Sequence, residues 1–297
     1  MSVLDPAVGV PHSSSEAARR PAPQQAAAGA PQLASIKPRR LAGHGLPRPL
    51  RRTIGPLAVL LLWQIASVTG LLPREILAGP TAVIASASRL LATGELQQAI
   101  VTSLGRAAAG LAIGGSAAVV LAILSGLFRL GEDLIDSSMQ MLRTMPIVAL
   151  IPLLIIWFGI GEQPKIALIA LATAFPLYLN VYAGIRNVDQ KLIEAGLTLG
   201  LSRIGLVWNV VLPGALPNAL IGLRYSLGVA WLALVFGEQI NANAGIGYLM
   251  NTARELFQTD VIVVCLMVYA LLGLIVDALV RVLERILLSW RPSFTGA

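Results

Sequence analysis

Six long apolar stretches, separated by short polar segments, limit this chain to one class of fold. They cover residues 54–72, 102–128, 134–158, 166–185, 216–236 and 261–282. As helices, each is long enough to cross a hydrocarbon core of about 30 Å. Only 12% of the residues are charged, about half the share usual for soluble domains. The sequence therefore predicts an all-α, polytopic membrane protein with about six transmembrane helices.

The N-terminal segment differs in composition from everything that follows. Residues 1–50 are rich in Pro, Ala, Gln, Ser and Arg and contain almost no bulky apolar side chains. Such a segment cannot bury enough surface to offset the entropy cost of ordering. We expect a disordered cytoplasmic tail at 1–50 and a transmembrane domain at 51–297. A targeting peptide is the alternative for the tail.

The net charge of +7 indicates how the chain is oriented. In a membrane protein, an excess of basic residues indicates cytoplasmic loops and contact with anionic lipid. Arg48, Arg51 and Arg52 directly precede the first apolar stretch, and Arg186 and Lys191 follow the fourth. The positive-inside rule then places both termini in the cytoplasm. No basic patch interleaved with aromatic residues is present, so nucleic acid is not an expected partner.

The polar stretch between the fourth and fifth apolar runs shows helical spacing of its own. Asp189 and Ser202 can cap two short helices, and Gly200 can end the first of them. Pro213 with Pro217 is expected to stop the second. Apolar residues recur at helical intervals in both halves: Leu192, Ala195, Gly196 and Leu199, then Ile204, Val207, Trp208 and Val211. Two amphipathic helices at a membrane face suit docking to another protein.

This stretch resembles the EAA loop of bacterial ABC-importer permeases. The family pattern is EAA, three residues, G, nine residues, then I-x-L-P, and the spacing fits throughout. The matching residues are Glu194, Ala195, Gly196, Gly200, Val210, Leu212 and Pro213. Glycine replaces the third motif residue at 196, and valine replaces isoleucine at 210. From about Leu72 onward the chain also resembles the branch for aliphatic sulfonates, taurine and nitrate, through phrases such as GIRNVDQKLIEAG and NANAGIGYLMNTARE.

The resemblance implies a fold, a function and a set of partners. The fold would be a type I importer transmembrane domain, with its core at about 95–285 and its coupling loop at about 189–213. The implied partners are a second permease copy, two ATP-binding cassette subunits that hold ATP and Mg, and a periplasmic or lipid-tethered solute-binding protein. The implied function is ATP-driven import of a small anion across the bacterial inner membrane by alternating access. Aliphatic sulfonate is the first candidate, and taurine or nitrate follows.

The resemblance also implies roles for residues of the coupling loop. In the family this loop docks in a groove of the ATPase. Glu194 would supply a charged contact there, while Ala195, Gly196 and Gly200 would allow close approach and a tight turn. Leu212 and Pro213 complete the motif. A helix that lies passively on lipid is the alternative for this segment, although its polar side is not strongly basic as lipid-surface helices usually are.

The chain shows no signature of an enzyme. Its two histidines, His12 and His44, both lie in the tail, and its single cysteine, Cys265, lies in an apolar run. A metal cluster or catalytic triad therefore cannot be drawn in the membrane part. The P-loop pattern G-x-x-x-x-G-K-[ST] is also absent. We expect a transporter subunit with no cofactor of its own, whose ATP is hydrolysed by a separate polypeptide.

Three arginines, Arg106, Arg143 and Arg224, fall within or near apolar stretches. A charge at mid-membrane costs at least about 2.5 kcal/mol, so such residues usually face protein or water. One interpretation is a cationic pathway for an oxyanion, whose geometry suits the guanidinium fork. The other is structural pairing or snorkelling to the membrane surface. The sequence leaves both interpretations open.

Several further features of the sequence predict local structure or allow two interpretations. Gly110 and Gly114 form a small-xxx-small pair, which indicates either a close dimer face or ordinary helix filler. Pro146 and Pro152 predict kinks within the third crossing. Residues 238–260 are expected on the outer side of the membrane with a short helix. This segment either contacts the binding protein or gates the outer mouth, or it is an ordinary connecting loop. A secondary carrier or channel for small anions is the alternative function, weakened because no carboxylate lies at a predicted midplane.

Overall fold

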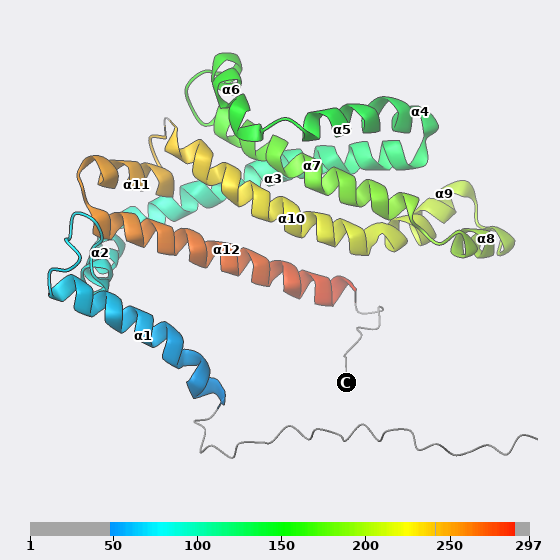
Figure 1. Ribbon diagram of the computed structural model, residues 1–297. Helices are drawn as coiled ribbons and strands as arrows, with labels where there is room; N and C mark the ends of the chain where they lie inside the picture. Colours follow the sequence, from blue (N-terminus) through cyan, green and yellow to red (C-terminus); the bar gives the residue numbers. More distant parts are fainter. Residues whose placement is uncertain (1–47, 241, 289–297) are drawn as a thin grey trace, which may run out of the picture. The chain divides into compact units, whose positions relative to one another are not determined.

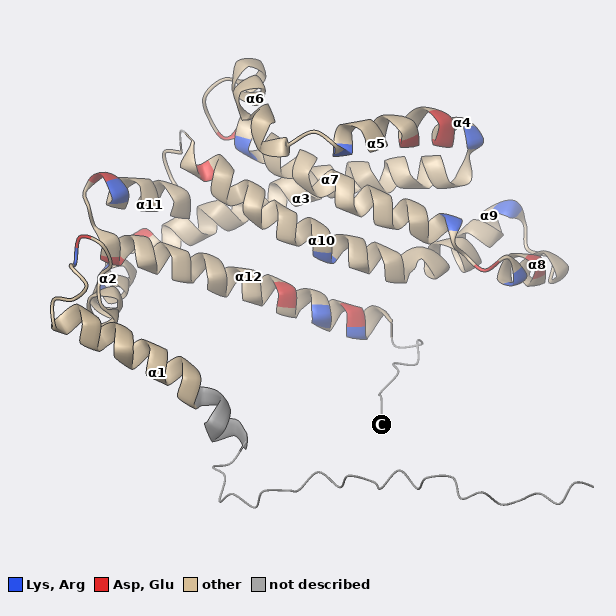
Figure 2. Ribbon diagram, viewed as in Figure 1, with Lys and Arg blue, Asp and Glu red and all other residues tan. Residues whose placement is uncertain are grey.

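The computed structural model describes residues 48–240 and 242–288, with side chains from residue 54 onward (Figure 1). The predicted disordered tail therefore lies outside the described residues as far as residue 47. The described residues from 52 to 288 belong to one compact unit. Within its described part the regular structure is helical throughout. Most charged residues lie at helix ends and connections and the middle of α7 carries none, but Arg106 lies within α3 and Arg224 within α10 (Figure 2).

Among the described residues, four helices are long and apolar enough to cross a membrane, which confirms an all-helical polytopic fold. They are α3 (Glu95–Leu127), α7 (Gln163–Arg186), the continuous helix Arg203–Gln239 that includes α10 (Leu212–Gln239), and α12 (Thr259–Leu287). These helices correspond to the second, fourth, fifth and sixth predicted crossings. The first apolar stretch forms α1 (Arg48–Val68), whose described apolar part, Ile54–Val68, is shorter than these four helices.

The third predicted crossing is a broken helix pair instead of one kinked span. Its first arm comprises α4 (Arg129–Gly131), a π-helical turn at Glu132–Asp136 and α5 (Ser137–Arg143). Its second arm comprises a 3-10 turn at Ile147–Leu150 and α6 (Ile151–Phe158), and the arms meet at 94°. Pro146 adopts extended backbone at the break, with ψ of 108°. A proline ring there removes a donor and excludes the helical continuation.

Helix α7 is the centre of the fold, because it packs against both α3 and α10 along most of its length (Figure 1). Its side chains Leu168, Ile169 and Tyr178 are fully buried. Gly110 and Gly114 of α3 face α7 directly. A Cβ atom on Gly114 would lie 2.0 Å from the carbonyl oxygen of Ala170. The small-residue pair therefore serves a contact within the chain, and its interpretation as a dimer face was wrong.

The α3–α7 contact leads to a test with a matched control. Gly114→Ala will lower the free energy of unfolding by about 1–3 kcal/mol, the usual cost of overpacking, because the added methyl group meets backbone that must shift. Gly105→Ala lies on the same helix with nothing within 4 Å of the new methyl group, so it should raise the free energy of unfolding by up to about 1 kcal/mol, the difference in helix propensity between glycine and alanine. Thermal unfolding in detergent compares the two variants. Equal midpoints would contradict the packing argument.

The two ends of the bundle carry different short helices. At one end, α8 (Gln190–Thr198) and α9 (Arg203–Leu206) connect α7 to α10. At the other end, α2 (Pro80–Ala92) and α11 (Ile246–Glu255) pack against α12 and α3. We name these the α8 end and the α11 end. The short helix predicted within 238–260 is confirmed as α11.

Candidate functional site

The first half of the EAA-like loop forms α8, with both ends built as its sequence predicts. The side chain of Asp189 accepts a hydrogen bond from the backbone N–H of Lys191 at 2.9 Å, which caps the N-terminus. Gly200 has φ of +81°, a left-handed conformation that glycine adopts without steric cost. The N–H of Leu201 donates to the carbonyl of Gly196 at 3.0 Å, and that of Gly200 donates to Leu197 at 3.0 Å. These bonds form a Schellman motif, which fixes the exit direction of the chain.

The second half begins as predicted but does not end where predicted. The Ser202 hydroxyl accepts from the N–H of Gly205 at 3.1 Å and caps α9. Pro213 and Pro217 do not stop this helix, contrary to the sequence expectation. The helix passes through a π-helical turn at Val207–Val211 and continues as α10. The wider π turn precedes Pro213 and gives the chain room where a proline would otherwise clash with the preceding turn.

Gly196 lies where α8 packs closely against α9. A Cβ atom on Gly196 would lie 2.8 Å from Cδ1 of Leu206 and 3.2 Å from Cδ1 of Leu201. The alanine of the family pattern would therefore require Leu206 to move. Gly200, by contrast, has no atom within 4 Å of the position that a Cβ would take, so its glycine is needed for its backbone conformation alone. Gly196 therefore allows α8 and α9 to approach closely, and Gly200 allows the tight turn between them.

The loop exposes an apolar surface that nothing in the described part of the chain covers. We define the α8–α9 surface as the five large side chains that are more than half exposed there: Leu192, Leu197, Leu199, Ile204 and Trp208. Leu199 is 83% exposed and Trp208 is 68% exposed. Glu194 and Ala195 are exposed on the same helix, whereas Leu212 is half-buried and Pro213 is exposed in the first turn of α10. Exposed large apolar side chains concentrated in one short segment are typical of an interaction site.

The last turn of α7, directly before α8, is tied to the π-helical turn of the broken arm. Glu132 accepts a hydrogen bond from the Tyr182 hydroxyl at 3.0 Å and forms an ion pair with Arg186 at 3.0 Å. Sequence reasoning did not identify this contact, because the partners lie 50 or more residues apart. The contact fixes the direction in which α7 enters α8.

The three arginines singled out from the sequence lie in different surroundings. Arg143 is exposed at the end of α5, just before the 94° break. Arg224 of α10 is partly exposed and pairs with two carboxylates of α12, Glu284 at 2.7 Å and Asp277 at 3.7 Å. It also lines a cavity of about 200 Å³ between α10 and α12. The structure therefore does not gather the three arginines into one site.

Arg106 belongs to a buried polar cluster at the α11 end. Its side chain is 3% exposed and lies between Glu238, which is 0% exposed, and Glu162, which is 51% exposed. Nη1 contacts Oε1 of Glu238 at 2.5 Å and the carbonyl of Ala244 at 2.8 Å. Nη2 donates to Oε1 of Glu162 at 2.7 Å, and Nε donates to Oε2. We name the Arg106 cluster by its members: Ser103, Arg106, Glu162, Lys165, Glu238 and Tyr269.

Glu238 is the most constrained member of this cluster. It accepts hydrogen bonds from the Ser103 hydroxyl at 2.6 Å, the Tyr269 hydroxyl at 2.9 Å and the backbone N–H of Gly247 at 2.9 Å. These donors come from α3, α12 and α11, so one carboxylate joins three helices to α10. Sequence reasoning missed both Glu238 and Glu162. The available signal was Arg106 itself, because an arginine inside an apolar stretch needs an anionic partner.

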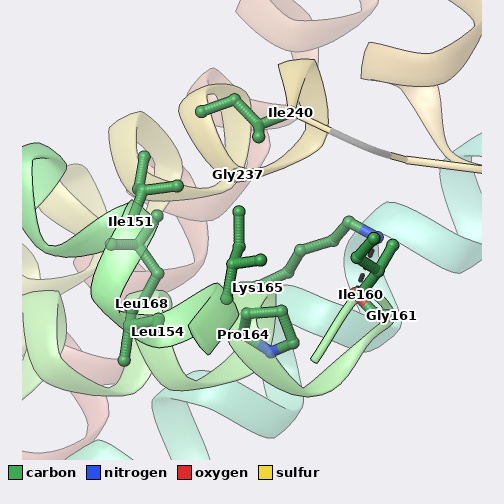
Figure 3. Close-up of a pocket in the computed structure, with 10 residues that line it drawn as sticks. Ile151, Leu154, Ile160, Gly161, Pro164, Lys165, Leu168, Gly237 and Ile240 are labelled. Atoms are coloured by element: carbon green, nitrogen blue, oxygen red, sulfur yellow. Dashed lines mark hydrogen bonds between the residues drawn. The ribbon is translucent and has the colours of Figure 1, made fainter. Parts of the chain in front are cut away.

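Lys165 completes the cluster from the first turn of α7. Its side chain is 4% exposed, and Nζ donates to the carbonyl of Gly161 at 2.9 Å and lies 3.4 Å from Oε1 of Glu162. Figure 3 shows the lysine stem extending toward Gly161 beside Ile160. The cavity that it lines measures about 20 Å³ and is otherwise mostly apolar. The hydrogen bonds from Arg106 hold the pKa of the Glu162 carboxyl below its usual value, so Glu162 stays ionised at neutral pH.

Comparison with known proteins agrees with this architecture. The family described as binding-protein-dependent transport system inner membrane component matches residues 114–288. The chain is 49% identical over 239 residues to a protein of Escherichia coli (strain K12) named aliphatic sulfonates transport permease protein SsuC, covering 80% of this chain and 91% of that one. It is 35% identical over 251 residues to the taurine transport system permease protein TauC of the same organism, covering 82% and 91%.

A solved structure shows the same fold. It is the crystal structure of an amino acid ABC transporter with histidines, with a TM-score of 0.55 and 17% identity over 67% of this chain and 97% of that one. Permeases of the matched family need no cofactor within the chain, and ATP is hydrolysed by a separate subunit. The chain therefore belongs to the binding-protein-dependent transport system inner membrane components, as a multi-pass permease subunit of an ABC importer.

Proposed function

We propose that this permease carries aliphatic sulfonates, with taurine or nitrate as the alternative anions. The observation that carries the proposal is the 49% identity, over 80% of the chain, to a protein named for aliphatic sulfonates. Identity to the protein named for taurine is lower, at 35%. Taurine is itself a sulfonate, so both relatives favour an oxyanion of the same chemistry.

The permease works within a larger assembly. A second copy of the chain supplies the other half of the pathway, two ATP-binding cassette subunits hold ATP and Mg, and a periplasmic or lipid-tethered binding protein delivers the solute. The α8 end faces the cytoplasm together with both termini. Basic residues at that end support this orientation under the positive-inside rule: Arg129, Arg186, Lys191 and Arg203. The surrounding lipid covers the exposed apolar helix faces.

The α8–α9 surface docks into the ATPase subunit. Its exposed leucines and Trp208 supply apolar area, and Glu194 supplies a charged contact at the edge. ATP binding closes the ATPase subunits, α8 moves with them, and the long helices turn the pathway outward. Because Glu132 ties the last turn of α7 to the broken arm, motion of α8 reaches that arm as well as α10.

Reconstituted uptake tests the proposed function. Proteoliposomes that contain the permease and its ATPase, supplied with the binding protein, should accumulate radiolabelled ethanesulfonate only when ATP is present on the α8 side. Accumulation without ATP would instead indicate a secondary carrier or channel. Accumulation of nitrate but not of sulfonates would identify nitrate as the substrate.

The pathway is proposed to include Arg143 and Arg224, whose side chains are accessible. Arg224→Gln should raise the ethanesulfonate concentration needed for half-maximal uptake by roughly tenfold, because a charge-assisted hydrogen bond contributes about 1.5–3 kcal/mol. Arg143→Gln should have an effect in the same direction. Arg281→Gln is the control, because it removes an equal charge from α12 that also contacts Asp277. Unchanged uptake in both test variants would remove Arg143 and Arg224 from the pathway.

A further inference from the structure

The charges of the Arg106 cluster balance only while Glu162 is present. Two cations, Arg106 and Lys165, are 3% and 4% exposed, and one carboxylate, Glu238, is 0% exposed. Glu162 is the second carboxylate and is 51% exposed. Without it, three buried charges would remain with a net charge of +1. An uncompensated buried charge is costly, so the cluster requires an anion at the position of Glu162.

Glu162 is the member of the cluster best placed to leave. It follows the loop Gly159-Ile160-Gly161, in which Gly159 has φ of +76° and neither glycine has a neighbour within 4 Å of a Cβ position. Within the described residues, the hydrogen bonds and ion pairs of its side chain are confined to Arg106 and Lys165. Glu238, by contrast, is held by donors from three helices besides Arg106. Rotation of Glu162 into solvent would uncover the cations without breaking the rest of the cluster.

The contacts of Glu162 are those that an oxyanion makes. Its two oxygens meet Nε and Nη2 of Arg106 side by side, with the Nη2 contact at 2.7 Å, and Oε1 is also 3.4 Å from Nζ of Lys165. A paired contact of this kind recognises planar or trigonal groups of oxygens. A sulfonate presents three equivalent oxygens, enough to contact the guanidinium edge and the ammonium together.

We propose that Arg106 and Lys165 form an oxyanion-binding site at the α11 end, which Glu162 occupies at rest and a small sulfonate takes over when Glu162 turns away. The inference rests on the proposed function, because that function makes a sulfonate the arriving anion and the α11 end its point of entry. Glu162 then acts as an internal competitor. It keeps the buried cations neutralised between transport cycles and weakens binding, so that the solute is passed on instead of being retained.

The test measures anion binding to the purified permease–ATPase complex in nanodiscs, without binding protein. Ethanesulfonate is titrated by calorimetry. Glu162→Gln keeps the shape of the side chain but removes the competing charge, so its dissociation constant should be at least tenfold lower than that of the parent complex. Adding Lys165→Met to this variant should reverse the gain. Glu95→Gln is the matched control, because Glu95 is an exposed carboxylate near the same end that makes no ion pair within the described residues.

Several outcomes would overturn the inference. Glu162→Gln could bind ethanesulfonate no better than Glu95→Gln, or the gain could survive Lys165→Met. Chloride binding as tightly as ethanesulfonate would exclude an oxyanion site. If Glu162→Gln fails to fold, Glu162→Asp replaces it: its side chain is one methylene shorter, so its carboxylate reaches Arg106 less well and should give a smaller gain in affinity of the same sign. No gain in a folded Glu162→Asp variant would also contradict the site.

The outcome for the site is separable from the outcome for the proposed function. If the parent transporter takes up ethanesulfonate with ATP and binding protein, but Glu162→Gln binds it no better, the site alone fails. If Glu162→Gln gains affinity for sulfonate and nitrate alike while the parent transporter takes up only nitrate, the oxyanion site stands and the substrate assignment fails.

Discussion

Replacing Gly200 by valine will uncouple ATP hydrolysis from uptake in the reconstituted transporter. Gly200 has φ of +81°, and a β-branched residue is strongly disfavoured there, at a cost of about 1–2 kcal/mol or more. The turn can relieve this strain only by breaking the Schellman hydrogen bonds to Gly196 and Leu197. The orientation of α8 relative to the ATPase subunit then changes. We expect sulfonate uptake per ATP hydrolysed to fall at least about tenfold, the factor that 1.4 kcal/mol represents, with ATPase activity retained.

The control for this experiment uses the same position. Asparagine enters the left-handed region more readily than most residues, so Gly200→Asn should keep most of the coupling. No atom lies within 4 Å of a Cβ at residue 200, so the Cβ atom of either variant meets no neighbour and the comparison tests mainly the backbone conformation. Glu194→Trp complements it on the exposed face of α8, where it leaves the chain's own packing intact but blocks docking. Full uptake in both Gly200→Val and Glu194→Trp would refute the proposal that this loop transmits motion from the ATPase to the long helices.

The features predicted correctly from the sequence are local ones. The caps at Asp189 and Ser202 and the turn at Gly200 each depend on a few neighbouring residues, and all three are confirmed. The helical segments within the apolar stretches follow from length and hydropathy alone. The EAA spacing, read as a resemblance, pointed to the family that the comparisons then showed.

The features that were missed depend on tertiary contacts. Whether Pro213 stops a helix is decided by the π-helical turn before it and by the packing of α10 on α7, which proline preferences do not encode. Gly114 could equally have faced a second copy until its contact with Ala170 was known. The partners of Arg106 lie 56 and 132 residues away along the chain. The sequence indicated that Arg106 needs an anion but could not identify which of the carboxylates provides it.

Removing the carboxylate of Glu238 will destabilise the fold more than removing any exposed carboxylate. Glu238 is fully buried and joins α10 to α3, α11 and α12. Glu238→Leu would leave Arg106 with one buried face unpaired, together with the hydroxyls of Ser103 and Tyr269. Breaking one side of a buried ion pair costs about 3–5 kcal/mol, and this decrease in the free energy of unfolding is measurable by SDS titration or thermal denaturation.

Two companion variants show whether the buried charge is the cause. Glu132→Gln removes a carboxylate from a partly exposed pair with Arg186, and such pairs contribute about 0–1 kcal/mol, so its stability should hardly change. Adding Arg106→Met to Glu238→Leu removes the unpaired charge and should recover part of the loss, because apolar replacements of buried ion pairs are often neutral. A Glu238→Leu variant as stable as Glu132→Gln would contradict the claim that the Glu238 carboxylate stabilises the fold. A double variant less stable than Glu238→Leu would show instead that Arg106 contributes through its contacts with Ala244 and Glu162.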